Sequence, residues 1–144
     1  MTKYLIGIDT GVNTGYAVAE DKGNGGELFE VRSLTITQAM SRTLEFVVHY
    51  GKENVCLFIE DARQRTWFTG GREKAQGVGS VKRDAQIRED WCKEQGLNYL
   101  MIHPAANATK TKADLFKKRT GWIERTNEHA RDAAMLVFKR FAKF

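Results

Sequence analysis

The sequence predicts one α/β domain built on a mixed five-stranded sheet that is flanked by helices. Three apolar runs at 4–9, 14–20 and 28–34, separated by turn residues, predict an antiparallel start. After them, helical periodicity alternates with short apolar runs, which predicts crossover connections. The chain of 144 residues is 42% hydrophobic and 28% charged, which suits a single domain, 1–144, with a real core. The expected order is βββαβαβαα.

The elements of the first half follow from spacing and turn residues. The segment DKGNGG, 21–26, is a turn between the second and third strands. An amphipathic helix follows, with Thr37 as its expected cap and with apolar residues at helical spacing: Met40, Leu44, Val47 and Val48. The run VCLFIE, 55–60, is apolar on both alternating faces up to its last residue, which is typical of a central buried strand.

The second half begins with a basic, glycine-rich stretch, 63–80, for which we expect a mobile loop that becomes helical towards its end. A helix over 81–95 and a strand over 98–102 follow. A basic helical stretch then leads to a final helix that begins near Thr126. Its apolar stripe is expected to comprise Ala130, Ala133, Ala134, Val137, Phe138 and Phe141.

Charge is distributed unevenly along the chain. The net charge is −4 over residues 1–61, +5 over 63–83 and +4 over 110–125, within a total of +5. Clustered positive charge predicts a polyanionic partner, and nucleic acid is the default. No run approaches 18 apolar residues, and no charged leader precedes an apolar segment, so we expect a soluble cytoplasmic protein without a membrane partner. Cys56 and Cys92 are expected to be reduced structural thiols.

Two acids each stand alone at the end of an apolar strand. Asp9 closes the first strand and Glu60 the fourth, while His129 and Asp132 lie three residues apart on one face of the last helix. If the two strands are neighbours and the helix crosses them, these four side chains converge. Carboxylates with one imidazole suit Mg²⁺ or Mn²⁺, and two such ions form a clamp for phosphodiester hydrolysis. The alternative for each residue is a turn cap, an ion pair or a surface position.

Three segments together resemble a known family. IGIDTGVNTGYAV (6–18) is similar to the first motif of the RuvC-type Holliday junction resolvases, within the RNase H-like superfamily: an Asp closes strand one and a TG precedes strand two. VCLFIED (55–61) resembles the second motif, and HARDAAMLV (129–137) resembles the HxxDA form of the third. The three motifs occur in the family's order and span almost the whole chain.

The resemblance implies an RNase H-like fold, a homodimer and paired nicks across a four-way DNA junction, with Asp9, Glu60 and Asp132 holding two metals. His129 would be a ligand or would orient the attacking water. It also implies an aromatic wedge after the second motif, where Trp67 or Phe68 is the candidate, and a basic residue before the last helix, where Lys110 or Lys112 is the candidate. The short chain favours a phage or prophage version. The full set of predicted DNA contacts is Arg63, Arg65, Trp67, Phe68, Arg72, Lys74, Lys82, Arg83, Lys110 and Lys112.

Three other functions remain open at the level of sequence. A DxG followed by T also opens actin-like ATPases, but that fold needs two such domains, so no nucleotide cofactor is expected. A second alternative is a module that binds branched DNA without cutting it. A third is a nuclease of the same fold that acts on RNA–DNA hybrids or structured RNA.

Overall fold

The computed structural model describes residues 2–10, 13–64 and 72–142, with the backbone alone between 72 and 81. It contains a mixed sheet of order β3-β2-β1-β4-β5. The strands are β1 (Lys3–Asp9), β2 (Thr14–Asp21), β3 (Glu27–Leu34), β4 (Val55–Glu60) and β5 (Asn98–Ile102). The helices are α1 (Ile36–Tyr50), α2 (Arg72–Gln95), α3 (Ala113–Thr120) and α4 (Glu128–Val137). The predicted α/β class and the predicted order of elements are confirmed.

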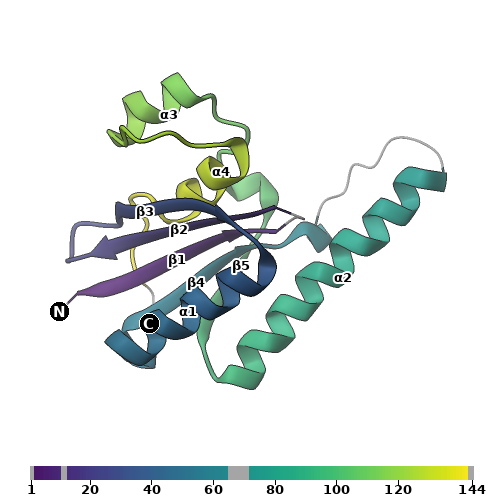
Figure 1. Ribbon diagram of the computed structural model, residues 1–144, viewed down its shortest axis with the longest axis horizontal. Helices are drawn as coiled ribbons and strands as arrows, with labels where there is room; N and C mark the ends of the chain where they lie inside the picture. The colour runs from purple at the N-terminus through teal and green to yellow at the C-terminus, as the bar shows by residue number, and fades with distance from the viewer. Residues whose placement is uncertain (1, 11–12, 65–71, 143–144) are drawn as a thin grey trace.

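Strand pairing also follows the prediction. β1 pairs with β2, and β2 with β3, in antiparallel register, whereas β1 pairs with β4, and β4 with β5, in parallel register. β1 is therefore central, and its carboxyl end lies beside the carboxyl end of β4. Figure 1 shows α3 and α4 on the upper side of the sheet and α1 and α2 on the lower side. Each face buries its own apolar cluster, because successive strand residues point to opposite faces.

Glycines let the backbone of α4 approach the sheet closely. A Cβ atom built on Gly15 would overlap the carbonyl oxygen of His129, and one built on Gly7 would overlap that of Ala133. Gly26 stands in the same relation to Val137. Glycine inside a strand often marks a close approach of another backbone. These residues thus determine how near the helix with the third motif comes to the strand with the first.

Several details of the helices differ from the sequence prediction. The cap of α1 is Thr35 rather than Thr37, because Thr35 and Gln38 form a reciprocal capping box. Val48, expected on the apolar face, is 86% exposed, and Phe46 is buried in its place. The helix predicted over 81–95 instead begins at Arg72, inside the expected loop, and it has 24 residues. The first half of α2 extends past the end of the sheet at which β1 and β4 terminate (Figure 1).

The last described residues are bound to the turn between β2 and β3. α4 stops at Val137, so Phe141 leaves the predicted stripe and is 55% exposed. The amide of Gly26 donates to the carbonyl of Arg140 at 2.6 Å, and the amide of Ala142 donates to the buried carboxylate of Asp21 at 2.9 Å. This turn and the last residues therefore stabilise each other.

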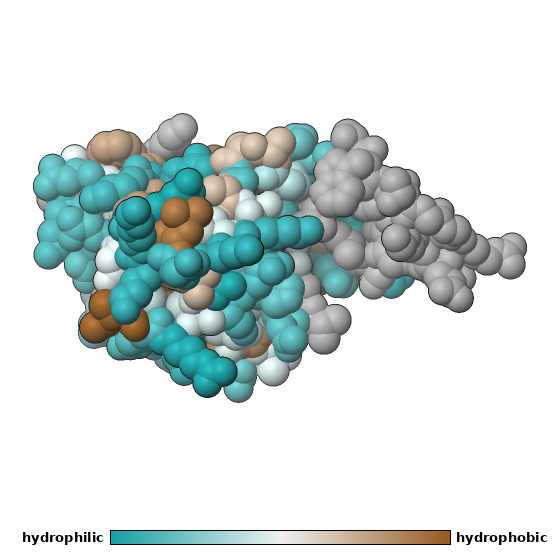
Figure 2. Space-filling view, turned by 90° about the horizontal axis from the view of Figure 1, so that it is seen from above, coloured by the Kyte–Doolittle hydropathy of each residue, from teal (hydrophilic) through white to brown (hydrophobic). Residues whose placement is uncertain are grey.

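The surface of the described residues is largely polar. Figure 2 shows hydrophilic side chains over most of the face seen from above, with small separate hydrophobic areas. None of the described helices has the length and hydropathy to cross a membrane. Cys56 and Cys92 are buried free thiols, and burial raises the pKa of each to about 12, so the expectation of structural thiols is confirmed.

Candidate active site

The carboxyl ends of β1 and β4 bring two buried acids together. The parallel register pairs Ile8 with Ile59, so Asp9 and Glu60 are the next residues of adjacent strands. Both continue the alternation that turns Leu5 and Phe58 towards α4. Asp9 is 4% exposed and Glu60 is 1% exposed. The condition on which the sequence argument depended, that the two strands are neighbours, is thus met.

The first turn of α4 lies over the end of β1. Asn127 caps the helix by accepting a hydrogen bond from the amide of Ala130 at 2.8 Å. His129, in this first turn, places Nδ1 3.3 Å from Oδ2 of Asp9. Its side chain is 47% exposed, in contrast to that of Asp9. The imidazole therefore bridges between a buried carboxylate and solvent.

Asp132 lies one turn further along α4 and is 7% exposed. Its Oδ1 accepts a hydrogen bond from the amide of Lys110 at 2.8 Å, and Lys110 adopts a left-handed backbone with φ of 57°. Asn107 donates to the backbone carbonyl of Asp132 at 3.1 Å. Burial raises the pKa of Asp132; the Lys110 amide opposes this, and the charge of Glu60 adds to it. Asp132 is therefore within electrostatic range of the end of β4.

The four predicted residues thus meet as two linked pairs rather than one closed cluster. Asp9 contacts His129 directly, and Asp132 interacts electrostatically with Glu60 and also with His129. Within the described part of the chain, no three His, Cys, Asp or Glu side chains are close enough to form a ready metal cage. The elements that carry the four residues therefore meet, whereas a metal site formed by their side chains stays a prediction.

Asp61, the neighbour of Glu60, serves a different purpose. Arg63 donates from Nε to its Oδ1 at 2.7 Å and from Nη2 to its Oδ2 at 3.0 Å, and Gln64 donates to Oδ2 at 2.9 Å. Arg63 also contacts Glu89 at 2.9 Å. Burial raises the pKa of Asp61, but these donors outweigh burial and hold the pKa below its usual value. Arg63, a predicted DNA contact, thus joins α2 to the end of β4.

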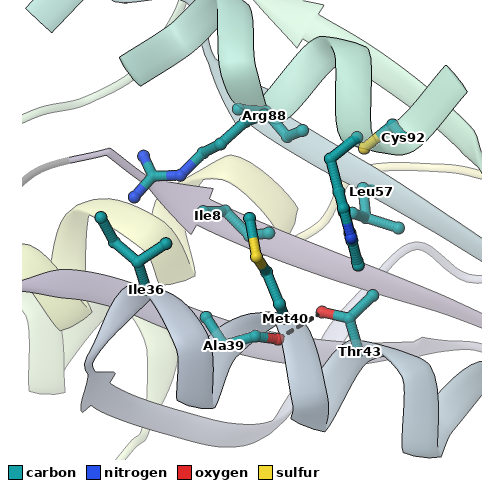
Figure 3. Close-up of a pocket in the computed structure, with 10 residues that line it drawn as sticks. Ile8, Ile36, Ala39, Met40, Thr43, Leu57, Arg88 and Cys92 are labelled. Atoms are coloured by element: carbon teal, nitrogen blue, oxygen red, sulfur yellow. Dashed lines mark hydrogen bonds between the residues drawn. The ribbon is translucent and has the colours of Figure 1, made fainter. Parts of the chain in front are cut away.

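A buried arginine occupies the opposite face of the sheet at the same end. Arg88 of α2 is 5% exposed and donates from Nη2 to Thr14 Oγ1 at 3.1 Å. Burial lowers its pKa, against the charges of Asp84 and Asp9. In Figure 3 its guanidinium points away from Cys92, towards the Ile36 side of an apolar cavity. The cavity holds about 10 Å³, room for at most one water, so it is a packing seam and not a ligand pocket.

The other predicted DNA contacts fall in three groups. Arg65, Trp67 and Phe68 lie outside the described residues, and Arg72 and Lys74 lie in the part of α2 described as backbone alone. Lys82 and Arg83 are exposed on α2. Lys110 and Lys112 are exposed between β5 and α3, and the amide of Lys110 contacts Asp132. The backbone of one candidate for the basic residue before the last helix therefore contacts Asp132.

Sequence reasoning missed the residues that position these groups. Asn107 and Arg88 carry no motif, and their partners, Asp132 and Thr14, are distant in the chain. The glycines did offer a signal, because Gly7 and Gly15 interrupt apolar strands where a backbone can approach. No protein-family model matches the chain, and a search of curated proteins found no match. The functional argument therefore relies on the site's geometry and on the motifs.

Proposed function

We propose that this protein is a divalent-metal-dependent endonuclease that resolves four-way or branched DNA junctions, of the RuvC-like type within the RNase H-like fold. The observation that supports this most is the meeting of three motif segments at one point. Asp9 and Glu60 end adjacent parallel strands, and α4 brings His129 to 3.3 Å from Asp9. In the proposed enzyme, two copies act as a homodimer and make paired nicks.

The donor set fits hard divalent cations. Asp9, Glu60 and Asp132 offer carboxylate oxygens and His129 offers an imidazole nitrogen, a combination suited to Mg²⁺ or Mn²⁺. Two such ions, when bound, would supply an activated water and stabilise charge on the attacking and leaving oxygens. The three carboxylates are the proposed holders.

His129 is well placed to handle a proton. With Nδ1 directed at Asp9, the carboxylate favours the tautomer that carries its hydrogen on Nδ1. Nε2 is then an acceptor, and the half-exposed ring can orient a water or take its proton. Asp9 would stabilise the imidazolium that results.

Exposed basic residues lie on two segments that reach this end of the sheet. The backbone of Lys110 contacts Asp132 and Lys112 follows two residues later, while Lys82 and Arg83 lie on α2, whose first half extends past the end of β1 and β4 (Figure 1). Lysine and arginine at such positions contact phosphates and position a nucleic acid without reading its sequence. We propose these four as backbone contacts. Arg63 would contribute indirectly, because its guanidinium is already bound to Asp61 and Glu89.

The test is cleavage of labelled four-way junctions, duplexes and RNA–DNA hybrids, with and without Mg²⁺. Asp9→Asn, Glu60→Gln and Asp132→Asn should each reduce junction cleavage by more than about 100-fold, because loss of a ligand exceeds the 10–100-fold cost of losing a supporting contact. Junction binding should persist, since phosphate contacts supply most of the affinity. Asp114→Asn, an exposed carboxylate on α3, is the matched control and should cleave normally.

Other outcomes identify the alternatives. Tight junction binding without cleavage in any divalent metal would make the protein a non-cleaving module. The absence of a ready metal cage among the described residues is the observation that favours that second candidate. Preferential cleavage of RNA–DNA hybrids or structured RNA would support the proposed hydrolysis but would replace branched DNA as the substrate.

A further inference from the structure

A basic lobe, residues 112–125, precedes α4 and consists of α3 and the segment that returns from it. It contains five basic residues and two acidic ones, a net charge of +3. All five basic residues are exposed: Lys112, Lys117, Lys118, Arg119 and Arg125. No described residue forms an ion pair with any of these five side chains. The basic lobe therefore presents a positive surface that no ion pair with a described residue neutralises.

The basic lobe is held in place at its base. Arg131, the neighbour of Asp132 in α4, donates from Nε to the carbonyl of Thr111 at 2.7 Å. It also donates from Nη1 to the carbonyl of Thr126 at 3.1 Å, so one side chain binds the residues that flank the lobe on both sides. Phe116 of α3 is 1% exposed and belongs to the apolar cluster between α4 and the sheet. The backbone of the lobe is thus positioned before a ligand binds, which reduces the entropy lost on binding.

The basic lobe lies on the side of the sheet towards which Asp9 and Glu60 point. In Figure 1, α3 lies above α4, on the side of α4 away from the sheet. The lobe begins two residues after Lys110, whose amide donates to Asp132 at 2.8 Å. Residues 117–119, in the last turn of α3, follow Lys112 by about 8 to 10 Å along the helix axis. The lobe therefore lengthens the basic surface that begins at Lys110.

The surface of the basic lobe fits a phosphodiester backbone better than a lipid surface. An amphipathic helix binds lipid through a large apolar face, whereas the large apolar residues of α3 are Phe116, which is buried, and Leu115. Figure 2, which views the molecule from the α3 side, shows hydrophilic surface with small separate hydrophobic areas. Duplex DNA carries one negative charge per about 1.7 Å of its axis, so a surface with several cations can contact several phosphates.

We propose that the basic lobe binds the phosphodiester backbone of a duplex arm of the DNA substrate, with Lys117, Lys118 and Arg119 as its contacts. These residues extend the contacts proposed at Lys110 and Lys112, and they lie outside the three motifs. The inference rests on the proposed function for its substrate. Because phosphates carry no sequence or branch information, the lobe contributes to the binding of junctions and of duplexes alike.

The test is the salt dependence of binding by the full chain in EDTA, measured with a fluorescein-labelled four-way DNA junction and with a labelled duplex. Lys117→Gln/Lys118→Gln/Arg119→Gln should flatten the log–log slope of affinity against salt by about 0.9 to 2.7 on both DNAs, since each phosphate contact contributes about 0.9. Binding at 0.1 M salt should weaken by at least about eightfold, the effect of one contact over a tenfold range of salt. Lys117→Arg/Lys118→Arg/Arg119→Lys keeps the charge and should bind like the wild type.

The matched control is Lys22→Gln/Lys93→Gln/Lys139→Gln, which removes the same charge from exposed positions at the opposite end of the sheet. Lys22 and Lys139 lie at the β2–β3 turn, and Lys93 lies in the last turn of α2, before β5 begins. This control should keep the slope of the wild type and an affinity within about twofold, because it removes no proposed phosphate contact. Thermal melts establish that each variant is folded at the assay temperature. If the triple variant of the lobe is not, Lys118→Gln alone should flatten the slope by about 0.9.

The outcomes separate this inference from the proposed function. A selective loss of affinity for both DNAs with the lobe variant supports the inference even if Mg²⁺ brings no cleavage, a result that would overturn the proposed enzyme alone. Equal losses for lobe variant and control would mean that total charge determines binding, which overturns the inference. A lower melting temperature with unchanged affinity would show that the three cations only stabilise the end of α3, as cations near a helix C-terminus do. A loss confined to the junction, or a wild type that binds vesicles with phosphatidylserine but neither DNA, would also overturn it.

Discussion

Two buried aspartates, Asp21 at the end of β2 and Asp132 within α4, show how differently one fold can treat the same side chain. Asp21 is 6% exposed and Asp132 is 7% exposed. Asp21 accepts hydrogen bonds from three backbone amides, those of Gly23, Gly25 and Ala142. Asp132 accepts one, from Lys110, and it lies within electrostatic range of Glu60 and Glu128. The two side chains are therefore buried to the same extent, but hydrogen bonds and neighbouring charges stabilise their carboxylates unequally.

The pKa directions express this difference. Burial raises the pKa of both groups, but at Asp21 the three amides outweigh burial and lower the pKa below its usual value. At Asp132 burial and the neighbouring carboxylates outweigh the single amide, so the pKa is raised. A carboxylate held against unfavourable electrostatics costs stability, and such groups concentrate at functional sites. The lowered pKa of Asp21 thus reflects stabilisation by the fold, whereas the raised pKa of Asp132 is the pattern that the proposed metal site would produce.

The largest expected effect comes from replacing a glycine beneath α4, the helix that carries Asp132. It tests whether the position of α4 on the sheet depends on these glycines. Gly15→Ala would place a Cβ against the backbone carbonyl of His129, and backbone yields less readily than a side chain. We expect a loss of about 4 kcal/mol, at the upper end for overpacking, and a fall in melting temperature of roughly 15 °C. Chemical denaturation and thermal melts measure both.

Gly23→Ala is the control for that substitution. Gly23 has φ of 110° but has no heavy atom near its built Cβ, so only backbone strain opposes the alanine. The cost should be about 1 kcal/mol. Equal losses for the two variants would mean that close packing of α4 is not what Gly15 provides, and α4 would then not be fixed relative to Asp9 in this way.

The sequence predicted the elements because their signals are local. Apolar alternation and turn residues identified all five strands to within one residue of their ends, and the acid at the end of VCLFIE pointed to Glu60. The pairing of β1 with β4, which brings Asp9 and Glu60 together, entered the sequence argument only as an assumption. The contact of His129 with Asp9 could be anticipated only as an assumption about where the last helix packs.

What the sequence could not supply depends on contacts between distant residues. The cap of α1 depended on Gln38 reaching back to Thr35, and Thr37 was an equally good cap by residue type. Arg63 resembled a DNA contact because its segment is basic, yet Asp61 and Glu89 bind it. A groove beside α4 is lined by residues of β3 and of the segment 125–130, which are too far apart in sequence for any spacing argument to connect them.

A second prediction concerns Asp21, the aspartate that the fold supports. Asp21→Ala removes the acceptor of three backbone amides, one buried and two partly buried, and detaches the last described residues from the β2–β3 turn. We expect a loss of about 3 kcal/mol, and so roughly 10 °C in melting temperature, because donors left without acceptors away from water are costly. Junction binding at low temperature should remain normal, since the turn lies at the far end of the sheet. A variant that melts like the wild type would show that Asp21 does not support the fold.

The smallest effect is a pH dependence of opposite sign at the two aspartates, measured by thermal melts between pH 3 and 8 in EDTA. The folded pKa of Asp21 lies below 3.8, so its contribution is complete above that value and is lost as pH falls through the folded pKa. The folded pKa of Asp132 lies above 3.8, so its ionisation destabilises the metal-free protein as pH rises from 3.8 through the folded pKa. Asp132→Asn should therefore melt at a higher temperature than the wild type at pH 7, and the difference should vanish near pH 3.

Asp21→Ala should behave inversely, with its deficit at pH 7 shrinking as pH falls below 3.8. If Asp132→Asn instead lost stability at pH 7, the surroundings of Asp132 would stabilise its ionised carboxylate, as those of Asp21 do. The contrast between the two aspartates would then be wrong.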